Sequence, residues 1–98
     1  MILRPTQNEQ GPLGYIFYCL ACQELHHIPV YQPNFVTNNK WEFNENLSCP
    51  TFNPSIVIQI NPNAKCHFSI NNGKIKYHGD STNLANQEID LIPIPEQL

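Results

Sequence analysis

The chain has 98 residues, a formal net charge of −3 and only five lysine and arginine residues. At this length residues 1–98 are expected to form one domain. The basic residues form no run, which argues against a protein that binds duplex nucleic acid through clustered phosphate contacts. No apolar stretch approaches the roughly 18 residues of a membrane span, and the first ten residues lack the apolar core of a secretory signal. We therefore expect a cytoplasmic protein with no membrane partner.

The predicted elements are short, rich in β-branched and aromatic residues, and separated by turn residues, which is typical of an all-β protein. We expect a small β-sandwich or an open barrel. The two ends, residues 1–12 and 93–98, are the segments that could be mobile or exchange between protomers. In chain order, the expected strands cover Gly14–Cys19, Leu25–Tyr31, a short stretch from Trp41 to Phe43, Ser55–Ile60, Cys66–Ile70, Lys74–His78 and Gln87–Ile92.

The clearest local signal is Asn72-Gly73, which predicts a two-residue type I′ turn between two strands. This turn sets Ile70 opposite Ile75, so that apolar side chains pair across the hairpin, whereas a slip of one residue would pair apolar with polar. The side chains expected on the core face are those of Cys66, Phe68, Ile70, Ile75 and Tyr77. Those expected on the opposite face belong to His67, Ser69, Lys74, Lys76 and His78.

A cluster of cysteine and histidine residues predicts a metal site. Segment 19–22 reads CLAC, and a histidine follows four residues later, at the start of an expected strand. A distant cysteine opens the hairpin and points to its core side. Thiolates and imidazoles are the ligands that tetrahedral Zn²⁺ prefers. The predicted zinc ligands are Cys19, Cys22, His26 and Cys66.

Two other interpretations of the CLAC segment stay open. The pair could be redox-active, although no βαβ pattern surrounds it. The thiols could also be buried packing groups or join in disulfides. Cys49 lies in a proline-rich loop and is expected to be a bystander. The alternative is that Cys49 replaces Cys66 or His26 as a ligand.

Two regions could form a ligand-binding surface. Residues 41–56 combine aromatic, amide and hydroxyl side chains with prolines, which could build a shallow pocket for a planar ligand. The alternative is that these aromatics serve the core. His67 and His78 share the outer hairpin face near Asp80 and could form a polar site, or a solvated sheet face. The candidate ligand-binding residues are Trp41, Asn44, Thr51, Phe52, Ser55, His67, Lys76 and His78.

No serine stands in a recognisable nucleophile motif, and no glycine-rich phosphate-binding loop is present. The serines considered are Ser48, Ser55, Ser69 and Ser81. No catalytic residue is therefore assigned, and a non-enzymatic role is favoured.

Four motifs carry a resemblance to a known family: CLACQELHHIPV at 19–30, WEFNEN at 41–46, PTFNPSI at 50–56 and CHFSINNGKI at 66–75. With them the chain resembles a family of small proteins of tailed phages and prophages, often labelled "ammonia monooxygenase". That pattern continues with a cysteine and a histidine where this chain has Ser81 and Asn83. The label implies no activity here, because a copper monooxygenase needs a histidine-rich site and usually a membrane.

The predicted zinc site and the resemblance together favour a zinc-binding, non-enzymatic module in the cytosol of a host cell. Such a module could sequester a nucleotide-like host signalling molecule or dock on a host defence protein, and a homo-oligomer would deepen its pocket. One alternative is a metal-dependent hydrolase of a nucleotide-like substrate, with His67, His78 or Asp80 as the base. Another alternative is a structural or adaptor protein of a phage.

Overall fold

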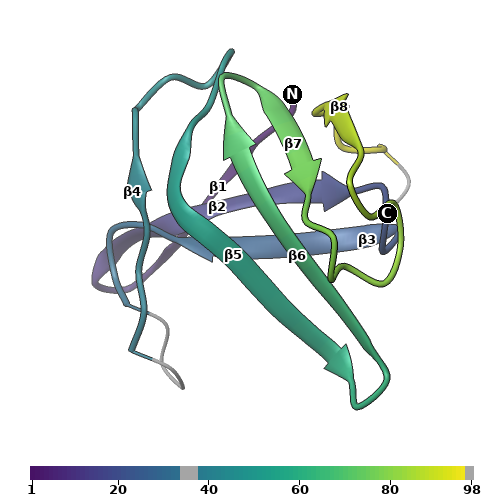
Figure 1. Ribbon diagram of the computed structural model, residues 1–98. Coiled ribbons are helices and arrows are strands. Elements are labelled where there is room, and N and C mark those ends of the chain that lie inside the picture. Colours follow the sequence, from purple (N-terminus) through teal and green to yellow (C-terminus); the bar gives the residue numbers. More distant parts are fainter. Residues whose placement is uncertain (34–37, 97–98) are drawn as a thin grey trace.

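The computed structural model describes residues 1–33 and 38–96, and within them the chain forms eight strands in two antiparallel sheets (Figure 1). The predicted all-β class is confirmed, as a sandwich of two sheets. None of the described residues forms a helix that could cross a membrane. The smaller sheet contains, in spatial order, β1 (Arg4–Asn8), β2 (Gly11–Cys19) and β3 (Glu24–Pro29). The larger sheet contains, in spatial order, β4 (Glu42–Phe43), β5 (Phe52–Asn61), β6 (Ala64–Asn71), β7 (Lys74–Tyr77) and β8 (Glu88–Asp90).

Strand β2 begins the core because its side chains alternate between the two faces of the sheet. Tyr15, Phe17 and Cys19 are buried, whereas Ile16 and Tyr18 between them are only half-buried. The same alternation runs through β3, where His26 and Ile28 are buried and His27 is exposed. The face of β3 that carries His26 and Ile28 is therefore the one that meets the core.

The β6–β7 hairpin has the predicted register. Asn72 and Gly73 have φ angles of 52° and 80°, which is the left-handed pair that a type I′ turn requires. Ile70 pairs with Ile75 and Phe68 pairs with Tyr77. As predicted, the side chains of Cys66, Phe68, Ile70, Ile75 and Tyr77 are buried.

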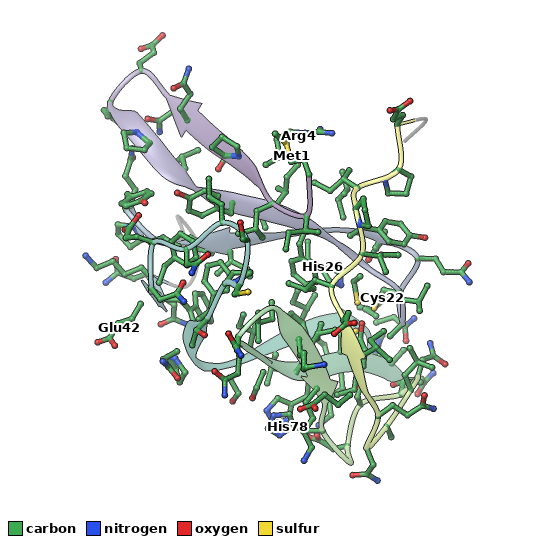
Figure 2. All side chains as sticks on the ribbon, turned by 90° about the horizontal axis from the view of Figure 1, so that it is seen from above. Met1, Arg4, Cys22, His26, Glu42 and His78 are labelled. Atoms are coloured by element: carbon green, nitrogen blue, oxygen red, sulfur yellow. The ribbon has the colours of Figure 1, made fainter. Side chains whose placement is uncertain are left out.

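Aromatic rings from the two sheets meet in the middle of the sandwich. Phe17 of β2 packs edge-on against Phe68 of β6, with ring centroids 5.4 Å apart. Burying a side chain of this size stabilises the fold by about 1.5–3 kcal/mol. Viewed from above, His26 and Cys22 lie between the two sheets, and His78 lies on the outer side of the larger sheet (Figure 2).

The two ends of the described chain are held against the sandwich. Residues 4–8 form β1, an edge strand that pairs with β2 and that the sequence pattern did not indicate. Leu3 is buried, and the backbone N–H of Ile94 donates to the carbonyl of Met1 at 2.9 Å. The segment before β2 is therefore paired along one sheet edge.

Strand β5 is irregular near its start. Phe52 pairs with Ile70 and Ile56 pairs with Phe68, so β5 carries two more residues than β6 over this stretch. Extra residues in one strand of an antiparallel pair change the direction of the side chains they carry. Ser55 lies in this stretch, and the backbone carbonyl of Ser55 accepts a hydrogen bond from Nε1 of Trp41 at 3.3 Å.

Candidate metal centre and Ser–His–Asp site

The four predicted metal ligands lie together at one end of the sandwich. Cys19 ends β2, Cys22 lies in the turn that follows, His26 is in β3 and Cys66 is in β6. The turn is closed by the N–H of Gln23, which donates to the carbonyl of Cys19 at 2.7 Å. Three ligands thus come from the small sheet and one from the large sheet, so a cation held here would join the two.

The distances suit a single metal ion. The candidate ligand atoms of the four residues all lie within 4.8 Å of one another, and the cysteines form no disulfide. The sulfur of Cys66 is 3.6 Å from that of Cys19 and 2.7 Å from that of Cys22. In a tetrahedral site with metal–sulfur bonds of about 2.3 Å, two sulfurs are separated by roughly 3.8 Å. The cluster could therefore bind a metal ion after small side-chain movements.

A nitrogen without a partner supports this assignment. Among the described residues, Nε2 of His26 is the buried side-chain nitrogen or oxygen for which no hydrogen-bond partner is found. Such an unpaired buried group costs about 1–3 kcal/mol. A buried imidazole with one unpaired nitrogen, in a cluster with three thiols, fits a metal ligand better than a packing residue.

The three thiols have different pKa values because their surroundings differ. Burial raises the pKa of Cys22 to about 11, and burial also raises the pKa of Cys66. Burial acts in the same direction on Cys19, but the adjacent His26 and Tyr77 outweigh it and lower the pKa of Cys19 to about 7. A metal ion would have to displace the remaining thiol protons, so its binding would release protons.

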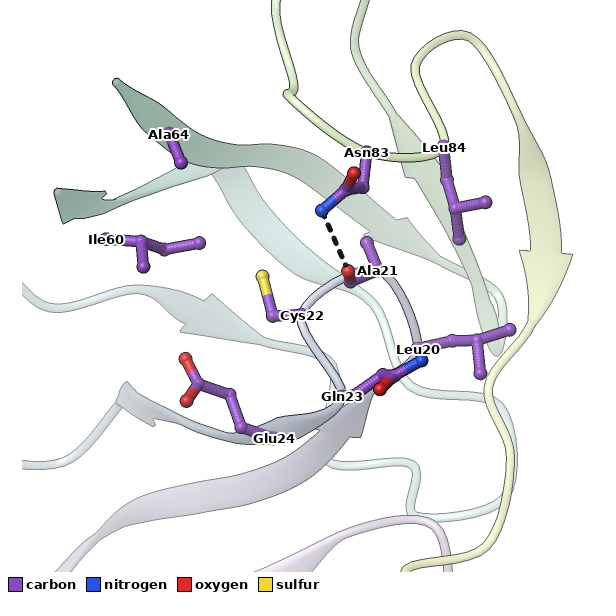
Figure 3. A pocket seen from close by; sticks show the side chains of 9 residues that line it. All are labelled: Leu20, Ala21, Cys22, Gln23, Glu24, Ile60, Ala64, Asn83 and Leu84. Carbon is purple, nitrogen blue, oxygen red and sulfur yellow. Dashed lines mark hydrogen bonds between the residues drawn. The ribbon is translucent and has the colours of Figure 1, made fainter. Parts of the chain in front are cut away.

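A hollow of about 650 Å³ lies beside the cluster (Figure 3). Cys22 lines it together with the apolar side chains of Ile60 and Leu84, and Nδ2 of Asn83 donates to the carbonyl of Ala21 at 3.2 Å. Cys22 is half-buried, whereas Cys19 and Cys66 are fully buried. The edge of the candidate metal centre at Cys22 is therefore the one nearest solvent.

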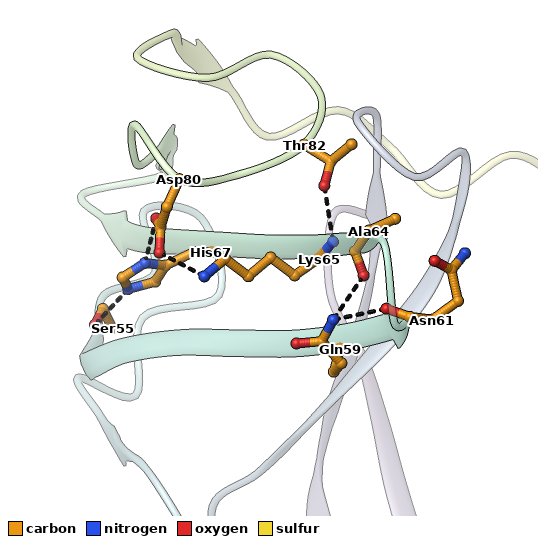
Figure 4. A network of polar contacts seen from close by, with 8 residues as sticks. All are labelled: Ser55, Gln59, Asn61, Ala64, Lys65, His67, Asp80 and Thr82. Atoms are coloured by element: carbon orange, nitrogen blue, oxygen red, sulfur yellow. Dashed lines mark hydrogen bonds and ion pairs between the residues drawn. The ribbon is translucent and has the colours of Figure 1, made fainter.

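A second constellation lies on the outer face of the larger sheet (Figure 4). Ser55 comes from the irregular stretch of β5, His67 from β6 and Asp80 from the turn after β7. The Oγ of Ser55 is 3.3 Å from Nε2 of His67, and Nδ1 of His67 is 2.7 Å from Oδ1 of Asp80. When Nδ1–H donates to Asp80, Nε2 is left to accept the hydroxyl proton of Ser55. This is the geometry of a serine nucleophile, its base and the carboxylate that orients the base.

Lys65 holds the carboxylate in place. Its Nζ lies 2.9 Å from Oδ2 of Asp80, so each oxygen of the carboxylate has its own partner. The hydrogen bonds from Lys65 and His67 lower the pKa of Asp80 to about 2. Asp80 therefore stays ionised throughout the neutral pH range.

His78 covers one face of the His67 ring. The two imidazoles stack with centroids 4.0 Å apart and an interplanar angle of 17°. Nε2 of His78 is 2.8 Å from Oγ of Ser69, which fixes the ring of His78 in turn. The ring plane of His67 is thus set by a stacked neighbour as well as by its hydrogen bonds.

The eight candidate ligand-binding residues do not form one surface. Ser55, His67 and His78 lie together, and Trp41 is half-buried next to Ser55. Phe52 is 2% exposed and stacks on Phe43 in the core, so its ring is not offered to a ligand. The three remaining candidates lie elsewhere: Asn44 and Thr51 bond to neighbouring loop groups, and Lys76 is exposed on β7. Binding of a small ligand by these eight residues therefore stays a prediction.

Sequence reasoning grouped Ser55 and His67 as ligand-binding residues and assigned no catalytic residue. Asp80 was considered only as a neighbour of His67 or as a candidate base for a metal-bound water. Serine triads have no fixed order or spacing in sequence, so no local motif could reveal this one. The sequence did predict that His67 and His78 lie on the same face of the hairpin, and this was the available signal for a polar site there.

The fold and these two sites define a small all-β protein with a Ser–His–Asp constellation on one sheet and a possible Cys₃His metal centre between the sheets. The model of the BubE family, described as a bacterial ubiquitination-like system serine protease, matches residues 2–78. Because this match spans more than half of the 98 residues, the chain belongs to the BubE family. The matched range includes Ser55 and His67 and ends just before Asp80. No curated protein and no solved structure matches the chain.

The family match does not bear on the resemblance to phage proteins. That resemblance rests on the quoted motifs and stays a prediction.

Proposed function

We propose that this protein is a serine protease of a bacterial ubiquitination-like system, with Ser55 as nucleophile, His67 as general base and Asp80 as the group that orients the base. The observation that carries the proposal is the hydrogen-bonded chain from Oγ of Ser55 through the His67 ring to Asp80. The family description supports it, because it names a serine protease.

In the first half of the reaction, Oγ of Ser55 attacks the carbonyl carbon of the scissile amide while Nε2 of His67 takes the hydroxyl proton. The tetrahedral intermediate then breaks its C–N bond, and His67 gives that proton to the leaving amine. An ester between Ser55 and the acyl half of the substrate remains.

In the second half, His67 takes a proton from a water molecule, which attacks the ester. His67 then returns the proton to the Ser55 oxygen as the C–O bond breaks, and the carboxylic acid product leaves. Throughout, Asp80 stabilises the imidazolium and holds the tautomer with the proton on Nδ1. Asp80 can do so because its lowered pKa keeps it charged.

Zinc is the metal that we assign to Cys19, Cys22, His26 and Cys66, since three thiolates and one imidazole form a common structural zinc set. Four protein ligands would leave no open position for a substrate or a reactive water. We therefore assign the metal a structural role. The bases considered for a metal-dependent hydrolase, His67, His78 and Asp80, lie on the other face of the larger sheet, which does not favour that alternative.

Hydrolysis of a small activated ester, p-nitrophenyl acetate, tests the nucleophile without requiring knowledge of the natural substrate. We expect the full chain to turn over the ester and Ser55→Ala to lose at least about 10³-fold in kcat. Ser48→Ala is the matched control, because Ser48 is exposed and lies in the loop before β5, where its N–H donates to Oδ1 of Asn46. A Ser55→Ala variant as active as the unaltered chain would contradict the proposal.

A further inference from the structure

We propose that the substrate is an extended peptide segment that binds as an added strand along the outer edge of β5. Bound in this way, the peptide would place its scissile bond beside Ser55. This inference rests on the proposed function and specifies its substrate class. The outer edge is defined here as the backbone of Ser55, Val57 and Gln59 on the side of β5 away from β6.

The hydrogen-bond ladder shows which backbone groups face this edge. The carbonyls of Lys65 and His67 accept from Thr82 and His78, on the β7 side of β6. The intervening residues Cys66 and Phe68 must therefore direct their backbone groups to β5, where they pair with Ile58 and Ile56. It follows that Val57 and Gln59 direct their N–H and C=O groups away from β6.

Within the described residues, this stretch of edge has no strand beside it. Strand β4 pairs with β5 only at Phe52 and Asn53, before the irregular stretch. An exposed strand edge with free N–H and C=O groups is a template for pairing with another extended chain. Peptide recognition by strand addition uses such an edge, with backbone hydrogen bonds for affinity and pockets for alternate side chains.

A side-chain groove accompanies the edge. It has a volume of about 340 Å³, and its lining includes Trp41, Pro54, Ser55 and Val57. Trp41, Pro54 and Val57 form its apolar wall, whereas Asn39, Lys40 and Ser55 form its polar wall. Val57 is 53% exposed. Because Ser55 is part of the lining, the apolar wall could receive the side chain of a residue close to the scissile bond.

The shape favours an extended peptide over a compact ligand. Small-molecule pockets bury most of their ligand's surface, whereas this shallow groove lies at Val57, one of the residues of the outer edge. Trp41 ties the groove to the reaction centre, because its Nε1 donates to the backbone carbonyl of Ser55. The outward carbonyl of Ser55 is therefore already paired, which leaves Val57 and Gln59 to pair with the peptide.

The test uses the full chain and a proteome-derived library of denatured linear peptides, with cleavage sites read by mass spectrometry. We expect cleavage of linear peptides with an apolar preference next to the cut. The best peptide is then remade with each backbone amide N-methylated in turn. We expect kcat/KM to fall by about tenfold or more at alternate amides only, because a paired strand directs every second amide to its neighbour.

The protein-side variant is Val57→Pro, which removes an outward N–H that does not bond to β6. Proline is tolerated at such a position of an edge strand. Val57→Thr, which keeps both the N–H and the branched shape, is the matched comparison. In each variant we measure peptide cleavage relative to that variant's own turnover of p-nitrophenyl acetate, and we expect this ratio to be about tenfold or more lower in Val57→Pro than in Val57→Thr.

Three results would overturn the inference. They are ester turnover with no cleaved peptide in the library, N-methyl effects without a period of two, and peptide cleavage by Val57→Pro at the normal rate. If Val57→Pro fails to fold, the N-methyl series on the unaltered chain decides. Absence of ester turnover in the unaltered chain would instead overturn the proposed function itself, and the inference with it.

Discussion

Cys66 and His67 are consecutive residues of β6 whose side chains leave opposite faces of the larger sheet. The thiol of Cys66 is 1% exposed and faces Cys19 and Cys22, and the imidazole of His67 faces Ser55 and Asp80. The same short stretch of backbone therefore carries one candidate metal ligand and the proposed general base. A displacement of the β6 backbone at Cys66 must therefore also displace His67, because the two residues are adjacent in the same strand.

Loss of the metal should consequently lower both stability and activity. We expect Cys66→Ser to abolish metal retention, to lower the free energy of unfolding by about 4 kcal/mol or more, and to reduce ester turnover. Elemental analysis, thermal unfolding and p-nitrophenyl acetate hydrolysis measure the three effects. Cys49→Ser is the control, because Cys49 is exposed and outside the cluster. Full metal occupancy in Cys66→Ser would remove Cys66 from the site.

The low pKa of Asp80 should depend first on Lys65. Two hydrogen bonds lower this pKa from 3.8 to about 2, so the stabilisation they give is complete above about pH 4 and is lost as the pH falls through about 2. We expect Lys65→Gln to raise the pKa of Asp80 toward its ordinary value, as followed by NMR titration of the side-chain carboxyl. Lys76→Gln, on an exposed site of β7, should leave it unchanged. A pKa that stays near 2 in Lys65→Gln would show that His67 alone sets it.

His78 should act as a positioning residue through its stack on His67. We expect His78→Ala to lower kcat about tenfold to a hundredfold with little change in KM, because a small tilt of the base disturbs proton transfer. His78→Phe keeps a flat ring over His67 and should recover most of the rate. Steady-state kinetics on the ester measure both variants. Equal losses in the two would point to a chemical role for the His78 imidazole instead.

Gly14 should tolerate no side chain. It lies in β2 opposite Pro29, and a Cβ at this position would overlap the backbone carbonyl of Ile28. Since the obstacle is backbone in a paired strand, we expect Gly14→Ala to lower the free energy of unfolding by more than about 2 kcal/mol. Chemical denaturation measures this, with Pro12→Ala, on an exposed site of the same strand, as the control. Similar midpoints for the two variants would mean that β2 and β3 can separate locally.

The metal cluster was predictable because its signals are local. Three ligands lie within residues 19–26, and the fourth, Cys66, could be placed on the core face from the Asn72-Gly73 turn and simple alternation. The hairpin register follows from the same turn. Strand β1 was not predictable, because its polar sequence RPTQN shows no apolar alternation and is held as a strand by pairing with β2.

The Ser–His–Asp site was not predictable for a different reason. The distance between Ser55 and His67 depends on the register between β5 and β6, and the two extra residues of β5 shift that register near Ser55. Asp80 reaches His67 only after the chain turns at the end of β7. A sequence pattern predicts on which face of a sheet a side chain lies. It does not predict the register between two strands, which is known only once the strands are paired in a structure.

Covalent labelling by a fluorophosphonate, with the modified residue mapped by mass spectrometry, tests the proposed chemistry most directly. Such a probe reacts with a serine whose hydroxyl is activated by a neighbouring base. We expect one adduct per chain on Ser55, no adduct in Ser55→Ala, and strongly slowed labelling in His67→Ala and Asp80→Asn. A folded, metal-loaded chain that stays unlabelled, or an adduct on another serine that persists in Ser55→Ala, would contradict the assignment of Ser55 as the nucleophile.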